Sequence, residues 1–265
     1  MGNETSRASL PHSLAKAVEC LEGFQAPSGP FDPNGAWEHK YAVWIVLPES
    51  QFGATRRLGG FRIKRTPASA NEATLQVDLA AVLGGRAFYG KGTSCYRVSA
   101  QLTCATDRLS TPRSWDLRSM ILYETNKPVP GTEARETGQV AEGMIRRRGA
   151  RRAKERTAPA PKAVTSNWSL FDAIQRLPGN EIAPMTFDMF EELDLLKPNQ
   201  RLAYRQSIEM ELGGKPVKLH GFEQIGEGIL PYTYWLDDQR RVLMAIGGRR
   251  AFILDPSAEI PEVAQ

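Results

Sequence analysis

The sequence of 265 residues predicts a mainly β fold, in which one antiparallel and strongly curved sheet forms a clamshell or open barrel. Short runs rich in aromatic and β-branched residues recur along the chain, and several alternate between apolar and polar residues as half-buried strands do. Turn residues such as Gly84-Gly85 and Gly213-Gly214 separate these runs. Strands and helices do not alternate at the spacing of parallel crossover units, which disfavours a doubly wound sheet. One or two short helices are expected to pack across the sheet.

The first 132 residues predict a β-rich N-terminal half that follows a short amphipathic helix. Leu14, Val18 and Leu21 share one stripe at helical spacing within residues 9–24, and Gly23 is a stop signal. After this helix the residue pattern is typical of β-strands. Leu75 to Leu79 is an example, in which apolar and polar side chains alternate. The predicted strands cover residues 37–46, 58–66, 75–79, 96–103 and 115–123.

Basic residues are concentrated in residues 133–165, which we predict to be an Arg/Pro-rich linker or loop. Residues 144–162 hold eight basic residues and one acidic residue, so this stretch is +7 and the rest of a +4 chain is −3. Its like charges repel each other, and its prolines favour an extended chain. The stretch has no aromatic side chain on which bases could stack, which disfavours nucleic acid as a partner. The alternative is an arm that binds polyanions through Arg146, Arg147, Arg148, Arg151 and Arg152.

Residues 166–265 predict a helix followed by a β meander that completes the same domain. Ser166 or Ser169 can cap a helix over residues 169–177, and Pro178 ends it. A second short helix is predicted over residues 187–195. The strands of the meander are predicted at residues 202–212, 217–222, 232–236, 242–246 and 251–254.

Composition limits the class and the compartment of the protein. Hydrophobic residues make up 41% of the chain and charged residues 24%, as in soluble globular proteins. No apolar run approaches the ~20 residues of a membrane helix, so no transmembrane segment is expected. The N-terminal residues lack the apolar core of a secretory signal. We therefore expect a cytoplasmic protein, or a periplasmic or secreted one if a signal peptide has been removed; the oligomeric state is not predicted.

Familiar catalytic and metal-binding patterns do not occur in the sequence. There is no HExxH pair, no GxSxG elbow and no phosphate-binding glycine loop, so neither a metal nor a cofactor is predicted. Both His39 and His220 lie on predicted strands and could meet on a concave sheet face. Together with Tyr232 and Tyr234 they are the candidates for proton transfer. The sequence leaves open whether the protein is an enzyme.

Aromatic residues are dense on and beside the predicted strands. One interpretation is that they fill the core of a large sheet, where aromatic side chains are favoured. The other is that some of them line an apolar or stacking groove, since a highly curved sheet can enclose a ligand cavity. The candidate ligand-binding residues are Trp44, Tyr96, Trp115, Tyr204 and Trp235.

Two segments resemble parts of uncharacterised exported bacterial proteins of unknown function. The run from Trp168 to Pro178 resembles a helix that packs across the curved sheet of those proteins, and Gly228 to Asp237 resembles their C-terminal hairpin. The resemblance covers residues 165–256 and implies a strand-rich clamshell or open barrel. It supplies no catalytic residues.

Three hypotheses for function follow from these patterns. The first is a non-catalytic binding or carrier protein that holds an apolar or amphiphilic ligand in a β clamshell. The second is a carbohydrate-active hydrolase or lyase that uses the concave sheet face. The third is polyanion binding through the arginine-rich segment.

Overall fold

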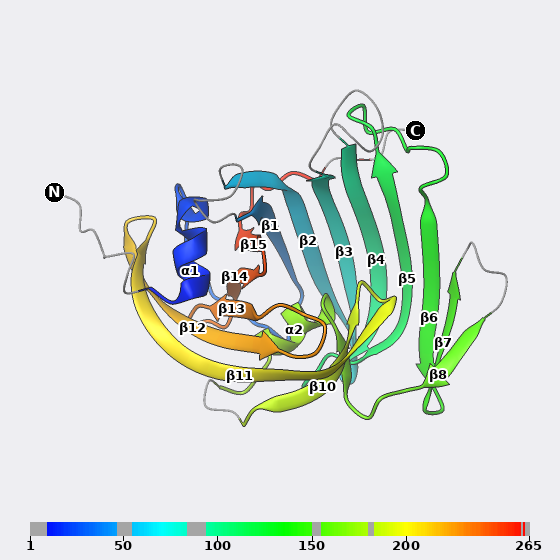
Figure 1. Ribbon diagram of the computed structural model, residues 1–265. Helices are drawn as coiled ribbons and strands as arrows, with labels where there is room; N and C mark the ends of the chain where they lie inside the picture. The colour runs from blue at the N-terminus through cyan, green and yellow to red at the C-terminus, as the bar shows by residue number, and fades with distance from the viewer. Residues whose placement is uncertain are drawn as a thin grey trace.

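One large sheet dominates the computed structural model, which describes residues 10–46, 55–83, 94–149, 155–179, 183–260 and 262 (Figure 1). Two short helical segments accompany it, an N-terminal one made of α1 (His12–Ala17) and the 3-10 turn η2 (Val18–Leu21), and α2 (Ser169–Gln175). The strands of the N-terminal half are β1 (Trp37–Ile45), β2 (Arg56–Ser69), β3 (Glu72–Leu83), β4 (Ser94–Ala105), β5 (Pro112–Leu122), β6 (Ala134–Ala141), β7 (Met144–Gly149) and β8 (Arg156–Pro159). Those of the C-terminal half are β9 (Val164–Ser166), β10 (Met185–Glu191), β11 (Leu195–Leu212), β12 (Lys215–Ile225), β13 (Tyr232–Leu236), β14 (Val242–Gly247) and β15 (Arg250–Leu254).

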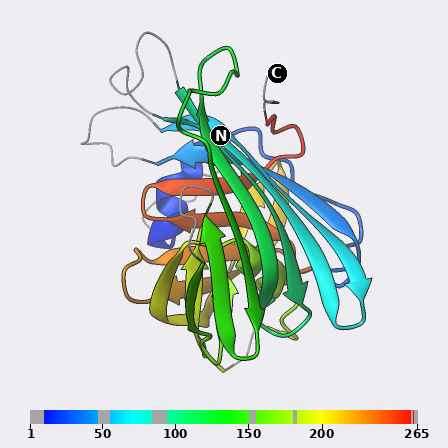
Figure 2. The ribbon, with the colours of Figure 1, turned by 90° about the vertical axis from the view of Figure 1, so that its right-hand side faces the viewer.

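The fifteen strands form one sheet, and β1 joins its two halves because it pairs with both β2 and β15. On one side of β1 the strands follow in chain order to β8, and on the other side they run backwards from β15 to β9. All these pairings are antiparallel except that of β9 with β10. The sheet curves strongly (Figures 1 and 2). It does not close into a barrel, because in the part of the chain described the edge strands β8 and β9 do not pair with each other. The predicted mainly β, curved and antiparallel fold with one or two short helices is confirmed, and the described residues contain two helical segments.

The basic segment at residues 133–165 contains strands β6, β7, β8 and β9 where a linker or loop was expected. Strand geometry accommodates the arginine run because successive side chains point to opposite faces. Ile145 is 3% exposed and faces the core, while Arg146 and Arg148 lie on the other face. Residues 150–154 lie outside the described residues.

The second helix predicted at residues 187–195 is wrong, because strand β10 and a tight turn occupy this stretch. Phe187 and Met189, two residues apart, are both buried, which is the period of a strand and not of a helix. Glu192 and Leu193 form the turn with φ of 49° and 61°, in the left-handed region. Leu193 is fully buried, so packing of its side chain supports this backbone.

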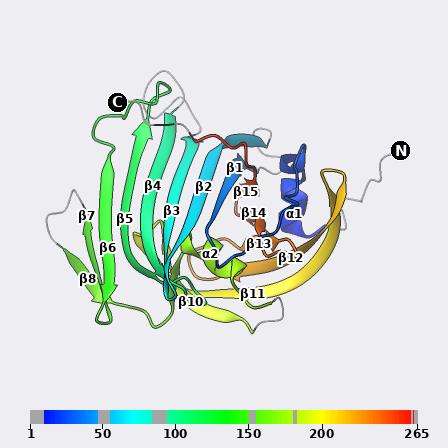
Figure 3. The same cartoon turned by 180° about the vertical axis from the view of Figure 1, so that it is seen from behind.

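The two helices lie on opposite faces of the C-terminal half of the sheet (Figures 1 and 3). Tyr234 of β13 packs its ring against Phe171 of α2, with ring centroids 5.6 Å apart. The next residue, Trp235, donates a hydrogen bond from its indole nitrogen to Ser13 Oγ of α1 at 3.3 Å. Because adjacent residues of a strand point to opposite faces, α2 packs on the inner, concave face and α1 on the outer face. No helix in the described ranges is long and apolar enough to cross a bilayer.

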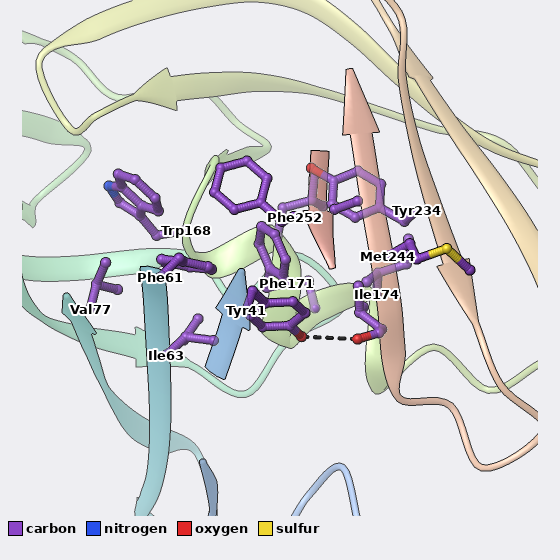
Figure 4. Packing of buried hydrophobic residues seen from close by; sticks show 14 of the residues in the cluster. Tyr41, Phe61, Ile63, Val77, Trp168, Phe171, Ile174, Tyr234, Met244 and Phe252 are labelled. Carbon is purple, nitrogen blue, oxygen red and sulfur yellow. Dashed lines mark hydrogen bonds between the residues drawn. The ribbon is translucent and has the colours of Figure 1, made fainter. Parts of the chain in front are cut away.

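Helix α2 packs on the inside of the curved sheet, against β1, β2, β13 and β15. All seven of its residues are buried, and its backbone begins where Ser169 N donates to Ser166 Oγ at 2.9 Å. Phe171 lies at the centre of an aromatic cluster (Figure 4). Its ring centroid is 5.2 to 6.1 Å from those of four rings: Tyr41, Phe61, Tyr234 and Phe252. The concave face is therefore occupied here by the protein's own aromatic core.

A buried ionic cluster anchors α2 to the N-terminal half. Asp172 accepts a hydrogen bond from Ser110 Oγ at 2.5 Å and one from Arg176 Nε at 2.9 Å. Its other carboxylate oxygen is 2.8 Å from Arg65 Nε. The side chains of Arg65 and Asp172 are each 2% exposed. The guanidinium of Arg65 also donates to the carbonyl oxygens of Asn34 and Gly35, which connects the helix to the chain before β1.

Candidate functional site

A cavity of about 550 Å³ lies between α1 and the outer face of strands β11 to β14, and we call it the α1 cavity. Its volume is within the range of about 300–1,000 Å³ that small-molecule sites occupy. The lining residues come from α1 and its N-terminal flank, from the end of β1 and from β11 to β14 with their connections. They are Pro11, His12, Ser13, Lys16, Val46, Arg205, Gln206, Gly221, Glu223, Leu230, Pro231, Thr233, Trp235, Ile246, Gly247, Gly248 and Arg249.

Trp235 and Gly221 build the apolar bottom of the α1 cavity. The two residues are direct partners on β13 and β12. A Cβ atom at position 221 would lie 2.7 Å from the Trp235 ring, so only glycine lets the indole lie flat across the neighbouring strand. Trp235 is 1% exposed, and its contact with Ser13 ties this wall of the cavity to α1.

The walls of the α1 cavity combine apolar side chains with a surplus of positive charge. Ile246, Leu230 and Pro231 contribute apolar surface, and Leu230 is 66% exposed. Three cationic side chains and one carboxylate line it, and the carboxylate, Glu223, forms an ion pair with Arg205 at 2.5 Å. The other two cations are Lys16 and Arg249. An apolar bottom beneath a cationic rim suits a ligand with a hydrocarbon part and an anionic group.

The two candidate catalytic histidines lie on β1 and β12, which are separated in the sheet by β13, β14 and β15. His39 stacks on Trp37 with ring centroids 4.8 Å apart, and its Nδ1 is 3.4 Å from the Tyr41 hydroxyl. Burial, assisted by the charge of Arg241, lowers the pKa of His39 to about 4. The imidazole is therefore neutral near pH 7 and acts as part of a packed aromatic group.

His220 contacts an acidic residue, with its Nε2 2.8 Å from Asp238 Oδ1. Such a pair can orient an imidazole for proton transfer. Tyr232 and Tyr234 pack against each other at 5.2 Å between ring centroids, and burial raises the pKa of both phenols. None of the four candidate catalytic residues lines the α1 cavity.

The structure brings one candidate ligand-binding residue, Trp235, to the α1 cavity. Trp44 is half-buried on β1 opposite Ala251. The phenol of Tyr96 donates to Glu192 Oε2 at 3.1 Å.

The remaining two candidate ligand-binding residues, Trp115 and Tyr204, pack within the protein. The ring of Trp115 is 5.6 Å from that of Phe190. The ring centroid of Tyr204 is 5.3 Å from that of Phe222. These contacts are those of a core, and the five candidates do not form one groove in the described residues.

The arginines of β7 divide between the two faces of the sheet. Arg147 points inward, where its guanidinium donates to the backbone carbonyl of Asp194 and lies 3.7 Å from Glu136 Oε1. Arg146 and Arg148 are on the outer face with residues of β6. Arg151 and Arg152 lie outside the described residues.

Comparison with known proteins places the fold and leaves function open. No family model matches the sequence, and no curated protein is significantly similar to it. A similar solved structure is that of the β-barrel-like protein of domain of unknown function DUF1849 from Brucella abortus. The two chains are 9% identical with a TM-score of 0.55, over 86% of this chain and 98% of that one. The likeness shows a shared β-barrel-like fold.

Sequence reasoning missed the charged residues of the α1 cavity. Lys16 occupies the polar side of a predicted helix, and no sequence pattern places that helix over β12 to β14. Arg205 and Arg249 come from distant parts of the chain that meet only through the pairing of the strands. A detectable signal was Gly221, since a glycine inside a strand often marks a close approach by a neighbouring group. In the described ranges, no three His, Cys, Asp or Glu side chains gather as a metal site.

Proposed function

We propose that this protein is a non-catalytic binding or carrier protein for a small amphiphilic ligand with an anionic group. The α1 cavity is the proposed site, instead of the part of the concave face that α2 and its aromatic contacts occupy. The observation that carries the proposal is the combination of an apolar bottom at Trp235 with a cationic rim at Lys16, Arg205 and Arg249. A hydrocarbon chain in the cavity gains about 0.8 kcal/mol for each CH₂ group removed from water.

The cavity suits binding better than turnover. Its titratable side chains are cations, His12 and a carboxylate already paired with Arg205. A hydrolase acting at this site would need a base and an acid converging on one bond. The His220–Asp238 pair is the observation that favours the carbohydrate-active alternative, and it lies outside the cavity.

The test is a calorimetric titration with dodecanoate and with the uncharged dodecyl maltoside. Thr233 lines the cavity from β13, so Thr233→Phe fills it and should abolish binding of both probes. The matched control is Thr186→Phe, which adds the same side chain at an exposed position of β10. Lys16→Glu should weaken the binding of dodecanoate by about tenfold and leave the binding of dodecyl maltoside unchanged, because it reverses a charge at the rim of the cavity. Equal binding by the wild type and Thr233→Phe would refute the α1 cavity as the site.

The carbohydrate-active alternative is tested with the same preparations. Wild type and His220→Ala are incubated with a panel of polysaccharides, and released products are measured. Product formed by the wild type and lost in His220→Ala would overturn the proposal that the protein is non-catalytic.

A further inference from the structure

The outer face of β2 to β7 is a polar platform separate from the α1 cavity. Along β3, Leu75, Val77 and Leu79 face the core, while Gln76 and Asp78 face outward. Strand pairing aligns the outward residues into rows that cross the sheet, and neighbouring strands lie about 4.8 Å apart. Three rows of direct partners result: Arg62, Asp78, Ser99, Arg118 and Arg135; Lys64, Gln76, Gln101, Asp116, Thr137 and Arg148; and Thr66, Thr74, Thr103, Ser114, Gln139 and Arg146.

These rows carry a net positive charge. They contain six basic residues and two acidic ones, a surplus equal to the net charge of +4 of the whole chain. Both carboxylates are already engaged by arginines of the same face, and one of the six basic residues, Arg146, forms an exposed ion pair with Glu142 at 3.3 Å. Asp78 contacts Arg62 at 2.5 Å and Arg97 at 2.9 Å, and Asp116 contacts Arg135 at 2.5 Å. The surplus therefore attracts anions from outside the protein.

Two shallow hollows lie side by side on this platform. One, of about 250 Å³, is lined by Arg62 and Arg118, by the carboxylates of Asp78 and Asp116, and by Gln76, Ser99 and Gln101 between them on β3 and β4. The other, of about 300 Å³, is lined by Arg146, Arg147, Arg148 and Glu155 with Ser114, Thr137 and Gln139. Asp116 of the first hollow is the direct strand partner of Thr137 in the second. Each hollow thus combines guanidinium groups with amide or hydroxyl groups.

We propose that this platform binds a linear polysaccharide that carries carboxylate or sulfate groups. A guanidinium can hold such a group through two parallel hydrogen bonds. The glutamine, serine and threonine side chains beside it supply donors and acceptors for sugar hydroxyls. A chain that lies across the strands runs along a row and meets one polar side chain at each strand that the row crosses.

The composition of the rows favours this ligand over two other polyanions. They contain no aromatic side chain, whereas sequence-independent binding of single-stranded nucleic acid uses stacking of bases on aromatic rings. They also contain no large apolar side chain of the kind that anchors proteins in a bilayer surface. The strands curve in this half of the molecule, which further limits contact with a flat membrane (Figure 2).

The test compares binding of polygalacturonate, dextran sulfate and neutral dextran to the full chain and to two variants of equal charge. Arg118→Gln with Arg148→Gln removes one exposed arginine from each hollow. Lys215→Gln with Lys218→Gln removes the same charge from exposed positions of β12. We expect at least one acidic polymer to bind the unmodified chain. The arginine variant should bind this polymer about tenfold more weakly, and its affinity should depend less on salt concentration. The lysine variant should bind it with unchanged affinity.

Thermal unfolding of both variants checks that the fold is intact. Single-stranded DNA and phosphatidylglycerol vesicles are measured in parallel. The proposal is overturned if neither acidic polysaccharide binds, if the arginine and lysine variants weaken equally, or if DNA or vesicles bind more tightly than both polysaccharides and depend on the same arginines.

Discussion

The buried carboxylate of Asp172 should be essential for stability, and Asp172→Asn is the change that tests this. Ser110 Oγ and Arg176 Nε donate to it at 2.5 Å and 2.9 Å, and Arg65 Nε forms an ion pair with its other oxygen at 2.8 Å. An asparagine keeps the shape but removes the negative charge, and its amide nitrogen would face a donor. Two guanidinium groups, 2% and 6% exposed, would then stay buried without their counterion.

Removing one partner of a buried ion pair costs about 3–5 kcal/mol, because the remaining charge is uncompensated. That is a large part of the roughly 5–15 kcal/mol by which a domain is stable. With a urea slope of about 2–3 kcal/mol per M, the unfolding midpoint should fall by about 1–2 M.

A double-mutant cycle isolates the interaction of Asp172 with Arg65. Urea unfolding of Asp172→Asn, Arg65→Met and the double variant should give a coupling of about 1–3 kcal/mol. The control cycle uses Arg113 and Glu72, an exposed pair 3.5 Å apart, for which about 0–0.5 kcal/mol is expected. A coupling at Asp172 no larger than that of the control pair would refute the view that this cluster anchors α2.

Three further predictions concern the core and the sheet. Phe171→Ala removes the centre of the aromatic cluster and should cost about 3–5 kcal/mol in urea unfolding; an unchanged midpoint would contradict its central role. The pKa of His39 is about 4 in the folded protein and 6.5 in an unfolded chain, so the unfolded state binds the proton more tightly. The free energy of unfolding should therefore be at its full value above pH 6.5 and fall by about 3 kcal/mol as the pH drops to 4. The variant His39→Gln should abolish this loss. A Cβ at Gly138 would lie 2.1 Å from the Trp115 ring, so Gly138→Val should destabilise the protein by about 1–3 kcal/mol and lower its melting temperature. The control is Gly149→Val, because no atom lies closer than 4.0 Å to a Cβ at that position. Equal melting temperatures for the two glycine variants would show that the ring of Trp115 moves aside freely.

Local patterns predicted the fold class because alternation and turn residues act over a few residues. The helix at residues 169–177 was located by its serine cap and by Pro178, and the structure has α2 at Ser169–Gln175. The strand β10 was mistaken for a helix because Phe187, Phe190 and Leu193 also fit a helical stripe. Only the pairing of β10 with β11 and β9 decides between the two interpretations.

The sites depend on contacts that no local pattern contains. Asp172 is a charged residue of a predicted short helix, yet it is buried because Arg65 and Arg176 converge on it from β2 and from the end of α2. The arginine run of β7 looked like a linker because charge was counted along the chain. Strand geometry divides it between a core-facing Arg147 and an outward-facing Arg146.

The most direct test of the proposed function is to locate a bound amphiphile on the protein. A fatty acid with a nitroxide label near the end of its chain broadens the amide NMR signals of nearby residues. We expect selective broadening at Ser13, Thr233 and Gly247, which line the α1 cavity. Broadening centred on Phe61 and Phe171 would place the ligand inside the curved sheet and contradict the account.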